Sequence, residues 1–153
     1  MSSGMPDLTG LSISDVATAS TLTLAADTIS VINYTGAAAC TATLPAATAG
    51  TIVVYCQSKD TTGGTATLVF DAAGSDVWAT GSVIESRGSS EVTFDTSAAG
   101  ETQLVFTPAN AATNLLTTGG QIAFICYEDA TWHIATKLAA ETTQVTGAFV
   151  FAA

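Results

Sequence analysis

Short runs rich in Thr and Val, divided by glycine-containing turns, recur along this sequence. β-Branched and aromatic residues favour extended backbone and glycine provides turns, so the pattern predicts short strands joined by loops. The expected strands are Thr21–Ala25, Thr28–Tyr34, Cys40–Leu44, Thr51–Ser58, Thr65–Phe70, Ser90–Asp95, Glu101–Phe106, Gln121–Tyr127, Thr131–Leu138 and Gln144–Phe151. About ten strands in one chain of 153 residues indicate a single all-β domain, a jelly-roll-like β-sandwich or barrel.

Alternation of apolar and polar side chains indicates which face of a strand is buried. Within Thr131–Leu138, Trp132 and Ile134 share the inner face, whereas His133 lies on the other face. The Thr51–Ser58 run begins with a continuous apolar stretch instead. Such a stretch is typical of a central strand that is covered on both faces.

The ends of the chain differ from its middle. Residues 1–20 are rich in Ser, Thr, Asp and Gly, so we expect an extended N-terminal arm there, followed by a β-sandwich or barrel domain over residues 21–153. The C-terminal segment Gly147–Ala153 is too apolar to stay in water, and we expect it to be buried at an interface. Thr107–Leu116 is the one expected helix, because a Thr cap is followed by Pro108 at the first helical position.

The chain is strongly acidic because basic residues are scarce. Three Lys or Arg residues stand against 13 Asp or Glu residues, giving a formal net charge of −10. Such a surface repels phosphate, so nucleic acids and anionic membranes are excluded as partners. No apolar run approaches the ~20 residues that span a bilayer, and the N-terminus lacks the regions of a signal peptide. We therefore expect synthesis in a reducing cytoplasm.

The sequence offers no catalytic or metal-binding constellation. The single histidine, His133, needs a Ser or Cys beside it in a pocket for nucleophilic catalysis, and the Gly-x-Ser-x-Gly motif is missing. Cys40, Cys56 and Cys126 are widely spaced within or near strand-like runs, so we expect buried thiols rather than a zinc site. We predict that the chain is not an enzyme and has no catalytic, cofactor-binding or metal-binding residues.

Two acidic segments are the remaining candidates for chemistry. The Asp71–Asp76 loop places two carboxylates around a glycine turn, which suits either a calcium ion or an ordinary Asx turn, and EF-hand spacing is missing. Glu85 and Glu91 are candidates for the paired carboxylates of a glycosidase, although no aromatic sugar platform accompanies them. We expect an Asx turn in the first segment and solvated loop charges in the second.

Three stretches of the sequence occur in an order similar to that of small β modules in tailed-phage virion proteins. They are Thr23–Asp27 continuing to Val31–Asn33, Thr43–Gly50 leading into the apolar strand, and Leu115–Gly120 followed by a strand to Tyr127, an acidic turn and Trp132. The family that the chain most resembles is that of the capsid decoration, or cement, proteins, especially those of marine and cyanobacterial phages.

The resemblance implies a homotrimeric structural protein on the outer surface of the capsid, where it clamps neighbouring subunits. The expected partners are the major capsid protein and other copies of this chain, and the expected location is the virion exterior after synthesis in the host cytoplasm. The family brings no catalytic residues. The alternative is a receptor-binding β module of a tail fibre or baseplate, for which Trp78, in the Asp76–Ala79 loop, is the candidate exposed aromatic residue.

Overall fold

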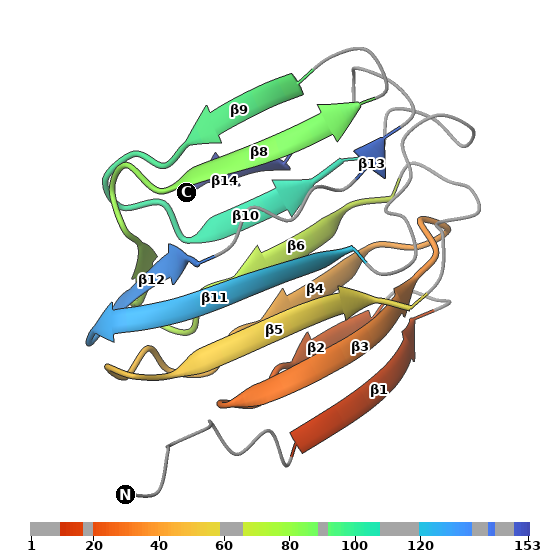
Figure 1. Cartoon of the computed structure of the whole chain (residues 1–153), viewed down its shortest axis with the longest axis horizontal. Helices are drawn as coiled ribbons and strands as arrows, with labels where there is room; N and C mark the ends of the chain where they lie inside the picture. The colour runs from red at the N-terminus through yellow and green to blue at the C-terminus, as the bar shows by residue number, and fades with distance from the viewer. Residues whose placement is uncertain are drawn as a thin grey trace, which may run out of the picture.

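The computed structural model describes residues 10–16, 20–58, 66–88, 92–107, 120–135, 141–142 and 149–153, and the regular structure within them is β-strand. Two large sheets lie one in front of the other as layers (Figure 1). The six-stranded sheet has the order β1 (Gly10–Val16), β3 (Thr28–Tyr34), β5 (Ile52–Gln57), β11 (Gln121–Glu128), β12 (Thr131–Ile134), β7 (Val77–Trp78). The five-stranded sheet has the order β14 (Phe149–Ala152), β10 (Gln103–Phe106), β6 (Leu68–Asp71), β4 (Cys40–Thr43), β2 (Ser20–Thr23).

A third, smaller sheet has the order β13 (Glu141–Thr142), β8 (Val83–Gly88), β9 (Val92–Thr96), and its strands β8 and β9 contact β14. The prediction of an all-β sandwich is confirmed, and the sheets do not close into a barrel. Within the described ranges, no helix is long and apolar enough to cross a membrane.

The first six strands alternate between the two large sheets. β1, β3 and β5 pair in parallel in one sheet, and β2, β4 and β6 pair in parallel in the other. Parallel neighbours need a crossover connection, and here each crossover contains a strand of the opposite sheet instead of a helix. The next strands pair antiparallel, β11 with β5 and β12, and β10 with β6 and β14. The parallel half departs from a jelly roll, whose strands are antiparallel.

The core between the two large sheets is rich in aromatic side chains. Phe124 on β11 lies among them, with its ring centroid 5.1 Å from that of Phe70 on β6 and 5.5 Å from that of Trp78 on β7. The indole of Trp78 in turn lies 5.6 Å from the ring of Phe151 on β14. These contacts connect both sheets with the C-terminal strand, so the two layers pack as one core.

Several predicted strands are confirmed, whereas the predicted covering of β5 is wrong. Thr28–Tyr34 is β3 over the same residues, and β5 is an inner strand of its sheet, as expected. Only one face of β5 is buried, however: Val53 and Tyr55 point into the core, whereas Val54 is half-buried on the opposite face. The five-stranded sheet covers the six-stranded sheet from one side, and the described part of the chain places no layer on the other side.

Two predicted loops contain strands instead. Trp78 lies on β7 and is fully buried, so the expectation of an exposed indole is wrong. Its strand pairs in parallel with β12, which sets Trp78 beside Trp132 inside the sandwich. Glu85 lies on β8, in register with Phe94 on β9, and not in a loop. Glu91 lies outside the described residues, as does the predicted helix beyond Thr107.

Both predicted termini contribute strands to the sheets of their own chain. Gly10–Val16, inside the predicted arm, forms the edge strand β1 and pairs with β3 over its whole length. Residues 149–153 of the apolar C-terminal segment are described, and the two phenylalanines among them are buried against their own chain: β14 pairs with β10, and Phe149 and Phe151 enter the core. Val150, between them, is 47% exposed.

Many of the carboxylates of this acidic chain hold its loops together. Five of them accept hydrogen bonds from backbone N–H groups: Asp27 from Ile52 (3.1 Å), Asp76 from Ala47 (2.6 Å), Asp95 from Phe151 (2.6 Å), Glu101 from Ala98 (2.6 Å) and Asp129 from Ala49 (2.9 Å). A bond from a neutral N–H to an ionised acceptor is stronger than one between neutral groups. Part of the negative charge is thus structural.

Two turn residues are expected to respond to substitution with opposite signs. Ala130, in the β11–β12 turn, has φ of 63°, and Gly100 has φ of +83° with nothing within 4 Å of the position that a Cβ atom would take. Left-handed backbone strains any residue with a Cβ by roughly 1–2 kcal/mol. Ala130→Gly should therefore raise the free energy of unfolding by up to about 1 kcal/mol, and Gly100→Ala should lower it by about as much. Urea denaturation measures both, and equal signs would contradict the strain argument.

Candidate functional site

The outward side of the six-stranded sheet carries an apolar face, which we define as Ile29, Val31, Ile52, Val54, Ala123 and Ile125. These side chains are half-buried and uncharged, and they come from the neighbouring strands β3, β5 and β11. The strand register sets them side by side: Val54 lies between Ile29 and Ala123, and Ile52 lies beside Ile125. Cross-strand pairs of β-branched residues fit a pleated surface well, but here that surface faces away from the core.

The outward side of the five-stranded sheet has a different composition. Its residues at the corresponding positions are Thr41, Thr43, Val69, Asp71, Gln103 and Val105. Val69, Val105 and Val150 of β14 lie side by side there, and hydroxyl, carboxylate and amide groups occupy the neighbouring positions. Both outward sides therefore carry aliphatic side chains, and the larger uninterrupted group is the apolar face of the six-stranded sheet.

A β-bulge interrupts the pairing of β11 with β12 next to the apolar face. Ile125 pairs with His133 and Glu128 pairs with Thr131, so Cys126 and Tyr127 together lie opposite Trp132. Tyr127 stands on the same outward side as Ile125, as the alternation of β11 requires, and 66% of its surface is exposed. The bulge acts at the end of the strand, where Glu128 is also exposed and does not return to the inner face.

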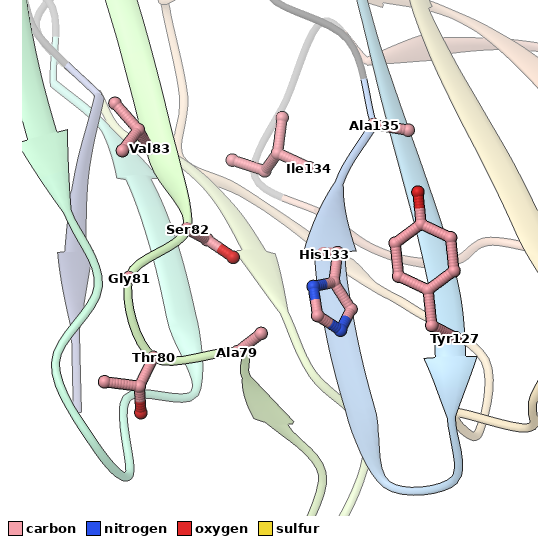
Figure 2. Close-up of a pocket in the computed structure, with 9 residues that line it drawn as sticks. All are labelled: Ala79, Thr80, Gly81, Ser82, Val83, Tyr127, His133, Ile134 and Ala135. Atoms are coloured by element: carbon pink, nitrogen blue, oxygen red, sulfur yellow. The ribbon is translucent and has the colours of Figure 1, made fainter.

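A groove of about 420 Å³ lies between this hairpin and the turn that joins β7 to β8. Tyr127, His133, Ile134 and Ala135 line one side, and residues 79–83 line the other. Figure 2 shows the imidazole of His133 between the ring of Tyr127 and the turn, with the side chain of Ser82 pointing across toward it.

His133 is the residue that links the groove to the hairpin. Its ring centroid lies 4.8 Å from that of Tyr127, with an interplanar angle of 65°, which is an edge-to-face contact. Its Nε2 atom is buried and has no hydrogen-bond partner in the described part of the chain. The sequence predicted a histidine on the surface of the sheet; it is half-buried, and no hydrogen bond joins it to Ser82 among the described contacts.

The two carboxylates of the predicted acidic loop serve separate structural contacts. Asp76 accepts a hydrogen bond from the backbone N–H of Ala47, and Asp71 accepts one from the amide of Gln103 at 3.1 Å. Among the residues that the structure describes, no three His, Cys, Asp or Glu side chains are grouped so that they could hold a metal ion.

The prediction of buried thiols is confirmed for two of the three cysteines. Cys40 and Cys126 are buried, whereas Cys56 is half-buried on the outward side of β5. Burial raises the pKa of the Cys56 thiol and that of the Cys126 thiol. Because the thiolate is the reactive form, a raised pKa keeps both cysteines in the unreactive thiol form near neutral pH.

Sequence reasoning selected the wrong aromatic residue for a binding site. Trp78 lies in the core, whereas Tyr127, predicted only as the end of a strand, is the exposed aromatic residue beside the groove. The Tyr-Glu-Asp-Ala turn after an apolar strand located the hairpin correctly, and the alternation of that strand, with Ile122, Phe124 and Cys126 inside, is the signal that places Tyr127 outside.

No protein-family model matches the chain, and no curated protein or solved structure matches it either.

Proposed function

We propose that this protein is a structural virion component that binds the outer surface of a phage capsid and stabilises the shell by bridging major capsid subunits. The apolar face of the six-stranded sheet is the observation that carries the proposal. An uncharged aliphatic surface on a chain with a net charge of −10 is suited to contact with another protein. The resemblance to decoration proteins supplies the identity of that partner.

The proposed mechanism is burial of the apolar face against the shell. Each Å² of apolar surface withdrawn from water contributes roughly 25 cal/mol of binding free energy. A protein that binds the assembled shell but not the free capsid subunits shifts the assembly equilibrium toward the shell by mass action. A homotrimer on the virion exterior, made in the host cytoplasm, is the assembly that the resemblance implies.

The number of copies in purified virions tests the proposed location. We expect quantitative mass spectrometry to give a ratio to the major capsid protein of about one, or of a simple fraction such as about one third, because a closed shell offers symmetric, equivalent sites. A handful of copies per particle would assign the chain to the tail instead. Absence from virions would reject a structural role in the particle.

A matched pair of valine substitutions tests the proposed contact surface. Val54 and Val69 are both half-buried on outward sides of their sheets, on β5 and β6 respectively. A buried, unpaired carboxylate is strongly unfavourable, so Val54→Asp should weaken binding to capsids assembled without this chain by at least about tenfold. Val69→Asp adds the same charge to the other sheet and should bind like the unaltered protein. Equal binding by both folded variants would show that the apolar face is not the contact.

A further inference from the structure

We propose that the groove between Tyr127 and the β7–β8 turn binds a neutral saccharide. This binding would be a second activity, in addition to the proposed attachment to the capsid. Tyr127 supplies an exposed aromatic ring, Thr80 and Ser82 supply hydroxyl groups, and His133 supplies an imidazole. A sugar ring combines an apolar C–H face with hydroxyl groups along its edge. This combination matches a groove in which an aromatic ring stands beside a few polar groups.

His133 lines the groove, and its buried Nε2 atom has no hydrogen-bond partner among the described residues. A buried polar atom that lacks a partner costs roughly 1–3 kcal/mol, which a ligand that completes the bond recovers. Tyr127 packs edge-on against the imidazole while most of its own surface is exposed to solvent. Because Nε2 is buried when the groove is empty, a sugar hydroxyl reaches it only when a neighbouring side chain moves, and Tyr127 is the ring in contact with the imidazole.

Charge selects a neutral saccharide over an anionic one. The nine residues that line the groove include no carboxylate and no ammonium or guanidinium group. The net charge of −10 repels sialic acids, sulfated sugars and phosphates at long range. Glycoside cleavage needs two carboxylates beside the glycosidic bond, and this lining has none, so the chemistry of the groove is binding.

The open shape of the groove suits a sugar within or at the end of a chain. The β7–β8 turn forms one wall and the β11–β12 hairpin forms the other (Figure 2), and the groove between them is open to solvent. An extended glycan therefore reaches the groove without threading through a closed entrance.

The single histidine of the chain makes the test direct, because its ring proton signals need no assignment among several histidines. The probes are the methyl glycosides of glucose, galactose, mannose and N-acetylglucosamine, titrated into the full chain. At least one of them should shift the His133 signals with a Kd of about 1–10 mM, a range typical of weak single-ring contacts. The proposal is overturned when none of the four shifts these signals at about 50 mM.

Matched variants separate binding in the groove from nonspecific contact. Tyr127→Ala should weaken binding of the responding glycoside at least about fivefold. Tyr127→Phe should keep the affinity of the unaltered protein, because the aromatic ring remains. Phe94→Ala removes an exposed ring on β9, outside the groove, and should change nothing. Unaltered affinity in a folded Tyr127→Ala variant, read from ligand-observed saturation transfer, would reject the groove as the site. Val54→Asp should keep sugar binding, so failure of the capsid proposal and failure of this one are distinguishable.

Discussion

Trp78→Ala should lower the free energy of unfolding by about 3–5 kcal/mol, the range for removal of a large aromatic side chain from a packed core. The indole is fully buried and contacts the rings of Phe124 and Phe151. Those two residues belong to different sheets, so the cavity would open at the junction of β7, β11 and β14. The two sheets cannot move together to fill this cavity, because each sheet is held in place by its own strand pairing. Urea denaturation followed by circular dichroism gives the change.

Two control substitutions make this result specific. Trp78→Phe keeps an aromatic ring and removes the indole N–H, whose nitrogen is buried and has no hydrogen-bond partner among the described residues. The loss of unfolding free energy in Trp78→Phe should be well under half of that in Trp78→Ala, because the cavity is smaller and an unpaired polar atom is removed. Phe94→Ala, at a side chain that is 60% exposed, should change stability by less than about 0.5 kcal/mol. A loss below about 1 kcal/mol for Trp78→Ala would contradict a core position for this indole.

The local pattern of the sequence predicted strands well where a strand carries a full alternation. Thr28–Tyr34 is the clearest case, since its buried residues fall at every second position of β3. β7 escaped prediction because it has two residues, too few for any periodicity, and owes its existence to the pairing with β12. β1 escaped because polar residues dominate its surroundings, while its backbone pairs with β3.

The parallel pairing of the first six strands was beyond the reach of local pattern. Alternating side chains show which residues face inward, but they do not show which strand lies beside which. The candidate site depends on that information twice. The apolar face exists because β3, β5 and β11 are neighbours, and the groove exists because the pairing of β7 with β12 brings the β7–β8 turn beside the β11–β12 hairpin. The continuous apolar run that begins at Ile52 is consistent with a strand buried on both faces and equally with a strand buried on one face only.

Alkaline pH should destabilise the protein through its two buried tyrosines, Tyr34 and Tyr55. Burial raises the pKa of both phenols above the ordinary value of about 10, and the nearby Cys40 thiol adds to the shift. Each hydroxyl donates a hydrogen bond inside the fold, Tyr34 to the carbonyl of Ala66 and Tyr55 to the side-chain oxygen of Gln57. A phenolate loses that donor, so the native state holds its protons while the unfolded chain releases them.

The sign of the effect follows from this difference in proton binding. Stability contributed by a group with a raised native pKa is complete below the unfolded pKa and declines as pH rises above it, by about 1.4 kcal/mol per pH unit for each tyrosine. Cys56 and Cys126, whose pKa values are also raised, add to the decline from a lower pH. Tyr55→Phe removes one phenol and leaves the thiols unchanged. Between about pH 10.5 and 11.5 the unaltered protein should therefore lose about 1.4 kcal/mol more than Tyr55→Phe loses, measured by urea denaturation at each pH. Equal pH slopes would mean that the Tyr55 hydroxyl is not held in its neutral form by the core.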